Sequence, residues 1–247
     1  MAMINGLKRR HNMLNKYIIK IIEASVRRAK NPEFRFDSNI TVSLLVSLVL
    51  NQFTFRLRGL KLIARGRLIK DLQLGVQVRF RNLKNIRFGA GIKLSDYVFL
   101  DGMGVGNIAL GDGCSIGSYS RIIISTSYSN LGEFITFGPN VAIGDFSYIG
   151  GAGGVSIGRD TIVGQYLSIH PENHIFTSTE IPIRFQGVTR QGIKIGENVW
   201  IGSKVTILDG VNVGDGSIIC AGAVLTAGVY PPRVVIGGCP AKVIRSR

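Results

Sequence analysis

The sequence predicts an all-β fold in which short parallel strands wind into a coil, and three observations support this. Aliphatic residues recur every six positions, most clearly at Ile195, Ile201, Ile207, Val213, Ile219 and Leu225. Glycine supplies 32 of the 247 residues, against a usual share of about 7%, which indicates many tight turns. Apolar residues make up 45% of the chain and charged residues 18%, which excludes a disordered protein.

A period of six fits neither an amphipathic helix nor a single long strand. It fits a coil in which each six-residue unit supplies one short strand and one turn. The aliphatic residue then points inward, and Gly, Asn or Asp makes the turn. Three units close one triangular coil, and stacked coils pair as parallel sheets around an aliphatic column. A β-sandwich with accidental spacing is the alternative, which a repeat of this regularity disfavours.

The first 56 residues lack the six-residue step. Five apolar residues there have helical spacing with basic residues between them: Leu14, Ile18, Ile21, Ile22 and Val26. We therefore expect a basic helical extension, residues 1–56, that caps the open first coil, because the end of such a stack exposes apolar side chains and unpaired edges. The repeat domain is expected over residues 57–247, with a weak start in steps of six from Leu62 to Ile86.

The largest break in the repeat lies between Ile169 and Ile195. Residues 170–192 are predicted to leave the coil as one excursion loop. Loops on rigid scaffolds are where binding and catalytic residues concentrate, so this loop is the first place to look for a site.

The positive charge is confined to the N-terminal part. Residues 1–90 hold 19 Lys and Arg against 4 Asp and Glu, whereas residues 91–247 hold 11 of each. A basic amphipathic helix beside the apolar segment 40–50 fits peripheral contact with an anionic membrane; a cap with a merely basic outer face is the alternative. That segment is too short to span a bilayer, which takes about 20 residues. Nucleic-acid binding is not expected, because no recognition motif is present.

Cysteine usage favours a reducing compartment. Cys114, Cys220 and Cys239 are odd in number, widely spaced and form no CxxC motif, so neither a disulfide framework nor a cysteine-type zinc site is indicated. With no visible secretory signal, the expected location is the cytoplasm, with the inner membrane face as the place of any peripheral contact.

Three segments together resemble the hexapeptide-repeat acyltransferases. They are HPENHIF (170–176), the run from Pro182 to Gly228 that contains IGENVWIG, and GCPAKVIR (238–245). More narrowly, the sequence is similar to the maltose, galactoside and xenobiotic O-acetyltransferases, including members from polysaccharide clusters. The resemblance implies a left-handed parallel β-helix, a homotrimer with the groove between subunits, and acetyl-CoA as co-substrate. The left-handed winding rests on the resemblance alone, since general rules favour right-handed crossovers.

The resemblance also implies the catalytic base. A loop histidine preceded by Asn holds that role in the family, and Asn173–His174 matches it. An imidazole that titrates near neutrality can take a proton from a hydroxyl and return one to a leaving thiolate. His170 is expected to orient His174 or to line the acceptor pocket. The remaining histidine, His11, is interpreted as a solvated residue.

The expected cofactor-binding residues follow the family pattern. Gly202 and Ser203 match the backbone N–H donors for the oxyanion. Trp200 either lies beside the groove or fills the core. Five further residues complete the expected coenzyme A groove and its phosphate contacts: Ala221, Gly222, Thr226, Lys242 and Arg245. Relatives often carry Lys after the Thr; here the residue is Ala227.

The sequence thus predicts an acetyl-CoA-dependent O-acetyltransferase that acts on a sugar or glycan hydroxyl, without a metal. A zinc carbonic anhydrase of the same fold would need three His ligands, and the repeat region has two. A non-catalytic scaffold or an ice-binding solenoid remains a competing class, and it predicts no coenzyme A binding. The acceptor itself is not identified; contacts are expected from residues 143–154 and 176–192.

Overall fold

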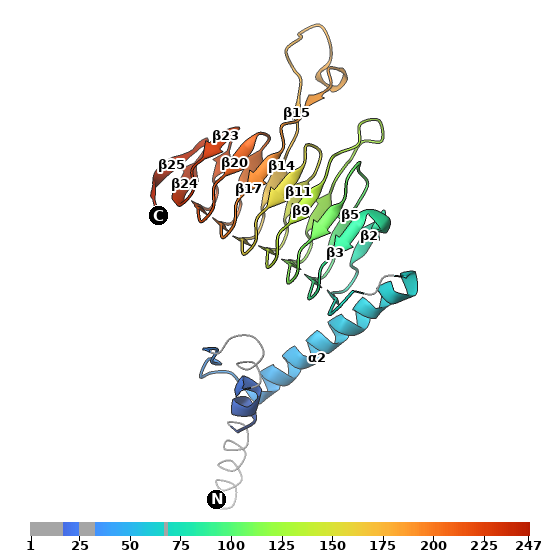
Figure 1. The fold of residues 1–247 in the computed structure, drawn as a ribbon, viewed down its shortest axis with the longest axis vertical. Coiled ribbons are helices and arrows are strands. Elements are labelled where there is room, and N and C mark those ends of the chain that lie inside the picture. The colour runs from blue at the N-terminus through green and yellow to red at the C-terminus, as the bar shows by residue number, and fades with distance from the viewer. Residues whose placement is uncertain (1–16, 25–32, 67–68) are drawn as a thin grey trace, which may run out of the picture. The chain divides into compact units, whose positions relative to one another are not determined.

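The structure is a computed structural model that describes residues 17–24, 33–66 and 69–247. It separates into two compact units, Met1–Thr54 and Phe55–Arg247 (Figure 1). Each unit is described by itself.

The second unit is a left-handed parallel β-helix, as predicted, built from three sheets that recur in the same order along the chain. Sheet A is formed by β1 (Gln73–Leu74), β4 (Lys93–Leu94), β7 (Ser115–Ile116), β10 (Ala142–Ile143), β13 (Ile162–Val163), β18 (Trp200–Ile201), β21 (Ile218–Ile219), β24 (Val234–Gly238) and β25 (Ala241–Ser246). Sheet B is formed by β2 (Arg79–Arg81), β5 (Phe99–Asp101), β8 (Arg121–Ile123), β11 (Tyr148–Gly150), β14 (Ser168–His170), β19 (Thr206–Leu208) and β22 (Val224–Leu225). Sheet C is formed by β3 (Ile86–Phe88), β6 (Ile108–Leu110), β9 (Ile135–Phe137), β12 (Val155–Ile157), β17 (Ile193–Ile195), β20 (Val211–Val213) and β23 (Gly228–Tyr230).

The aliphatic residues that recur every six positions point into the interior of this coil. Strands pair in parallel with their aliphatic residues in register, so that Ile157 lies beside Ile195 and Ile195 beside Val213. All six residues of the longest run are buried and belong to one hydrophobic core. Burying them stabilises each coil by roughly 1.5–3 kcal/mol per large aliphatic side chain, which explains why one local repeat can specify so much of the fold.

The corners follow two different rules. At the corner from sheet C to sheet A the left-handed positions are taken by Gly, Asn or Asp in most coils, as predicted. At the corner from sheet A to sheet B the prediction is wrong in four successive coils, where aromatic residues hold positive φ angles. These are Tyr97, Tyr119, Phe146 and Tyr166. Their half-exposed rings lie face to face, with centroids 4.8 to 5.1 Å apart.

The first coil begins later than the repeat suggested. Leu62 is buried in the core, but it lies in the 3-10 helix η1 (Leu60–Arg65) and not in a strand. A second short helix, η2 (Leu83–Asn85), links β2 to β3. At the other end β25 turns back antiparallel to β24. All three cysteines are free, and burial raises the pKa of the Cys114 thiol to about 11.

In the first unit, residues 17–24 are helical and α2 (Val42–Gly59) begins after Thr41, whose hydroxyl accepts the Leu44 N–H at 3.2 Å. The helices expected within residues 1–56 are therefore present; whether they cap the coil stays a prediction. His11, Leu14 and Val26 lie outside the described residues. Much of α2 is apolar and exposed, including Val49 and Leu50. Within the described residues, no helix is both long and apolar enough to cross a membrane.

Candidate active site

The predicted excursion leaves the coil where β14 ends at His170 and rejoins it at β17. Figure 1 shows the segment that carries β15 projecting away from the stacked coils. Inside it β15 (Asn173–His174) pairs antiparallel with β16 (Val188–Thr189), so that His174 lies opposite Val188. A short helix, η3 (Ile183–Phe185), follows β15, and the Gln186 amide donates to the Ser178 carbonyl at 2.9 Å and accepts the Ser178 N–H at 3.0 Å. The hairpin thus fixes the backbone of Asn173 and His174.

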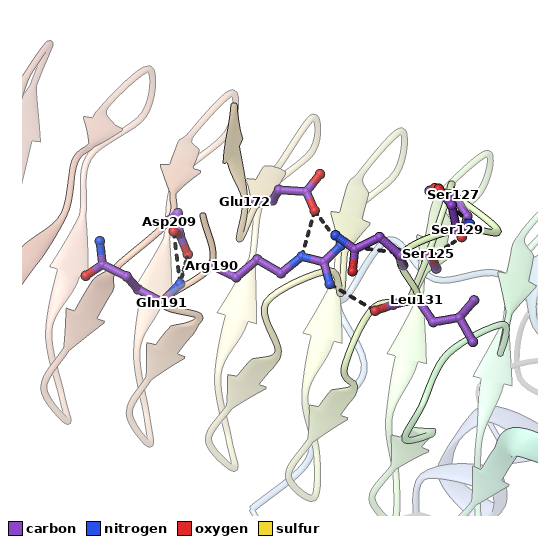
Figure 2. A network of polar contacts seen from close by, with 9 residues as sticks. Ser125, Ser127, Ser129, Leu131, Glu172, Arg190, Gln191 and Asp209 are labelled. Carbon is purple, nitrogen blue, oxygen red and sulfur yellow. Dashed lines mark hydrogen bonds and ion pairs between the residues drawn. The ribbon is translucent and has the colours of Figure 1, made fainter. Parts of the chain in front are cut away.

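Two side chains, Asp209 and Arg190, tie the base of this excursion to the rest of the β-helix (Figure 2). The carboxylate of Asp209, which is 1% exposed, accepts the N–H groups of Gln191 at 2.9 Å and Gly192 at 2.8 Å. Arg190 donates from Nε to Glu172 at 2.7 Å and from Nη1 to the Leu131 carbonyl at 2.9 Å. Arg190 therefore joins the two strands of the excursion and fastens them to a second loop, residues 124–134.

Between the two loops lies a cavity of about 230 Å³. His170 and His174 both line it, together with Tyr148, Glu172 and the backbone around Gly151. The structure therefore brings the two loop histidines into one concave site, where small molecules typically bind. Asn173 adjoins the site in sequence but is not among its lining residues.

His170 is held in a fixed orientation within this cavity. Its Nε2 lies 2.7 Å from the Ser168 hydroxyl, and its ring stacks on Tyr148 at 5.5 Å. Burial of the ring lowers the pKa of His170, and burial raises the pKa of Tyr148 while the charge of Arg121 opposes that rise. At neutral pH the cavity thus presents a neutral imidazole and a protonated phenol, both able to hydrogen-bond a neutral ligand.

His170 and His174 are both exposed, but among the described residues only the His170 side chain has a hydrogen bond and a ring contact that hold it. His174 is exposed on the hairpin and faces the cavity with the rest of the lining. Such a group can exchange protons with a bound hydroxyl and with solvent. The roles of His174 as base and of His170 as a positioning residue stay predictions, and the geometry is compatible with both.

The expected cofactor-binding residues lie elsewhere on the coil. Trp200 is 54% exposed on the outer face of sheet A, between Ile162 and Ile218. The core-filling alternative for Trp200 is therefore wrong. Its indole is available to a ligand or to another chain.

Gly202, Ser203, Ala221 and Gly222 stack in successive turns at the corner from sheet A to sheet B. The Gly222 N–H donates to the Ser203 carbonyl at 2.9 Å, which joins the two turns. The Gly202 N–H donates to the Ile219 carbonyl at 2.8 Å. That N–H is used within the stack, so the expectation that Gly202 supplies an oxyanion donor is corrected. Ser203 stays a candidate for that donor.

The remaining predicted residues lie at the C-terminal end of the coil. Thr226 is exposed after β22, and its carbonyl accepts the Tyr230 hydroxyl at 3.3 Å. Lys242 and Arg245 are exposed on β25, opposite Gly237 and Val235. These positions follow one another along the same end of the coil as Ala221, as a long anionic ligand would require.

The histidines and most of the cofactor-binding residues thus occupy different edges of one chain; the exception is Thr226, which follows β22 of sheet B two coils beyond β14. His170 ends a strand of sheet B and His174 lies on the excursion beyond it, whereas Trp200 belongs to sheet A and Ser203 to the corner before sheet B. None of the expected cofactor-binding residues lines the histidine cavity. Across the described ranges, no cluster of three or more His, Cys, Asp or Glu side chains could hold a metal ion.

Comparison with known proteins assigns the chain to a family. Residues 192–227 match the model for the bacterial transferase hexapeptide (six repeats). The chain is 30% identical over 187 residues to WbbJ of Escherichia coli (strain K12), which carries the name lipopolysaccharide biosynthesis O-acetyl transferase; the match covers 73% of this chain and 87% of WbbJ. The chain belongs to the hexapeptide-repeat acetyltransferases.

A solved structure agrees with this hexapeptide-repeat fold. The crystal structure of a Bacillus cereus acetyltransferase, the product of the BC4754 gene, superposes with a TM-score of 0.51 at 21% identity. The match covers 70% of this chain and 83% of that one. At that identity, the match supports the β-helix fold of this hexapeptide-repeat acetyltransferase and nothing beyond the fold.

Sequence reasoning on this hexapeptide-repeat acetyltransferase missed several residues of the site. Tyr148 falls within residues 143–154, from which acceptor contacts are expected, but its outward position in the repeat carries no signal that singles it out. Glu172 and Arg190 lie within the motif segments, but their pairing joins residues 18 positions apart. Asp209 follows a strand directly and is buried; a charged residue adjoining an aliphatic run was the one signal that could have found it.

Proposed function

We propose that the chain is an acetyl-CoA-dependent O-acetyltransferase that acts on a sugar or glycan hydroxyl in surface polysaccharide biosynthesis. The observation that carries the proposal is the cavity shared by His170 and His174 in a member of an acetyltransferase family. The name of WbbJ supports oxygen as the acceptor atom and a polysaccharide as the setting.

The proposed mechanism assigns a role to each group of the site. Acetyl-CoA supplies an acetyl group activated as a thioester. His174 removes the proton of the acceptor hydroxyl as the oxygen bonds to the acyl carbon, and it returns that proton to sulfur as the carbon–sulfur bond breaks. His170 and the Tyr148 phenol hold the acceptor through hydrogen bonds. Ser203 offers the backbone N–H for the developing oxyanion.

The turn that contains Ala221 and Gly222 leaves open space for coenzyme A. A Cβ added to Gly222 would meet nothing within 4 Å, and Ala221 beside it is exposed. An extended pantetheine arm can lie against such open turns. Lys242 and Arg245 are cations suited to its phosphates, and Trp200 and Thr226 complete the assigned contacts.

The separation of the two groups on one chain supports a shared site. The excursion of one subunit would present His174 to the turns of Ser203 and Ala221 on a neighbour. Rotational symmetry repeats such a heterologous contact around a closed ring. A homotrimer, as the family resemblance implies, would hold three identical grooves.

The test is an acceptor screen with radiolabelled acetyl-CoA, comparing the wild type with His174→Ala. General-base catalysis contributes about 10²–10⁴ in rate, so His174→Ala should lose that factor while calorimetry still detects acetyl-CoA binding. Alkaline hydroxylamine releases O-acetyl esters and spares amides, so retention of the label would indicate an N-acetyltransferase. Wild-type rates in His174→Ala would show that the assigned base is wrong. Failure of the wild type to bind acetyl-CoA would favour a scaffold.

We also propose that the first unit contacts the inner face of an anionic membrane, with the enzyme on the cytoplasmic side. Exposed apolar residues on α2 support this, among them Val46, Val49 and Phe53, as does the basic N-terminal part, because lysine and arginine near such a surface contribute about 1 kcal/mol each. Co-sedimentation should be strong with vesicles containing phosphatidylglycerol and weak with phosphatidylcholine alone. Val49→Glu should reduce it; equal sedimentation with both vesicles would contradict the proposal.

A further inference from the structure

Sheet B carries a basic and aromatic cluster on its outer face, in coils that precede the histidine cavity. The Phe99 ring has three guanidinium groups around it: the Cζ atoms of Arg79, Arg81 and Arg121 lie 5.9, 5.9 and 5.4 Å from its centroid. The strand register explains the grouping, because β5 is paired with β2 on one side and β8 on the other. Arg79 and Arg121 are therefore neighbours of Phe99 in the same row.

The three arginines differ in their partners. Arg81 is neutralised by Asp101, a fully buried carboxylate that also accepts the Asn82 side-chain amide at 3.1 Å. This contact raises the pKa of Arg81. Among the residues that the structure describes, neither Arg79 nor Arg121 has an ion-pair partner. Two unpaired positive charges thus lie on either side of one aromatic ring.

The cluster continues into the cavity without interruption. Arg121 is the register partner of Tyr148 on β11, and Tyr148 stacks on His170 of β14. Neighbouring strands lie about 4.8 Å apart, so two strand steps separate Arg121 from β14 by roughly 10 Å. A saccharide unit with its reacting hydroxyl at the histidines could therefore place another substituent at Arg121.

We propose that Arg121 and Arg79 form a subsite for an anionic group of the acceptor, a carboxylate or a phosphate, so that the preferred acceptor is an acidic sugar. The guanidinium fork matches both anions through paired hydrogen bonds. Phe99 supplies an apolar floor between the two forks, which strengthens charge interactions by excluding water. This inference rests on the proposed function for the place of the hydroxyl, whereas anion binding itself requires no acetyl transfer.

The test measures binding by NMR titration of the full chain without acetyl-CoA. The probes are methyl glucuronide, glucose 1-phosphate and the neutral methyl glucoside. At least one acidic probe should bind more tightly than the glucoside, and the tighter of the two identifies the anion. Arg121→Gln should weaken that probe roughly tenfold, the loss expected for a charge-assisted hydrogen bond, and leave the glucoside unchanged. Arg79→Gln should act in the same direction.

The matched control is Arg87→Gln, an exposed arginine on β3 of sheet C. It should leave acidic-probe binding unchanged. Equal binding of all three probes to the wild type, or an equal loss in Arg87→Gln, would overturn the subsite. If acetyl transfer fails while Arg121-dependent binding persists, the proposed function alone is wrong; if transfer occurs on sugars regardless of charge and of Arg121, the subsite alone is wrong.

Discussion

At the scale of single residues, the aromatic corner shows how a neighbour can override a local preference. A non-glycine residue in the left-handed region costs roughly 1–2 kcal/mol. Tyr119, however, stacks on rings from the coils before and after it, at 4.8 and 5.1 Å. The strand spacing of about 4.8 Å holds the rings at this distance, and each aromatic pair contributes about 0.5–1.5 kcal/mol. Stacking therefore offsets the backbone strain, which a rule based on single turns cannot foresee.

Two glycines of the predicted cofactor groove should respond differently to alanine. A Cβ on Gly202 would lie 2.5 Å from the Ala221 nitrogen, inside the stack, whereas a Cβ on Gly222 meets open space at a φ of 72°. We expect Gly202→Ala to lower the thermal unfolding midpoint clearly more than Gly222→Ala, whose strain is about 1–2 kcal/mol. Calorimetric melting of both variants tests this. Equal melting temperatures would mean that the turns of Gly202 and Ala221 move apart at little cost to accommodate the added Cβ.

His170 should make stability depend on pH. Burial lowers its pKa in the folded state, so between that value and the unfolded pKa of about 6.5 the unfolded chain binds the proton more readily. The contribution to stability is present above the unfolded pKa and is lost as pH falls through the folded pKa. We expect the wild type to lose more stability between pH 8 and pH 5 than His170→Gln does. Parallel melting-temperature profiles would contradict the assignment.

At the scale of elements, the sequence predicted those parts of the fold that are determined by residues close together along the chain. Most core strands carry an inward apolar residue that belongs to a block with six-residue spacing, and the largest break between blocks marks the excursion. The anchoring of the excursion was not predictable in this way. Arg190 reaches the carbonyls of Asn130 and Leu131, some 60 residues earlier, and only the stacking of the coils brings the two loops together. The winding of the coil likewise places the predicted histidines after sheet B and most of the predicted cofactor-binding residues on sheet A or at the corner before sheet B.

The anchors of the excursion should control its order and not the stability of the coil. Asp209→Asn replaces a buried carboxylate that accepts two N–H groups, and hydrogen bonds to charged groups are worth about 1.5–3 kcal/mol. We expect faster amide hydrogen exchange across residues 173–189, with the core strands still protected. Arg190→Met should act in the same direction, and Arg184→Met, a change on the exposed helix η3, is the control. Uniform exchange across all of β14 to β19 would instead indicate a general loss of stability.

At the scale of the whole molecule, the fold bears on the proposal that one chain carries two incomplete halves of a site. A β-helix offers three outer faces and three corners that lie apart, and its rigidity prevents one edge from folding over onto another. The excursion on the edge after sheet B and the open turns before sheet B can meet only if two chains combine. The proposed catalytic unit is thus an interface, and its symmetry determines how many sites form.

Mixing two inactive variants tests this arrangement directly. His174→Ala removes the proposed base, and Ala221→Trp fills the open turn of the cofactor groove without entering the core, because Ala221 is exposed. Each variant alone should be inactive. After co-expression at equal levels, a ring in which each site takes its base from one subunit and its groove from the next should contain intact sites at about a quarter of the wild-type number. Acetyl transfer per mole of chain measures that fraction. If both halves instead belonged to one chain, co-expression would restore no activity.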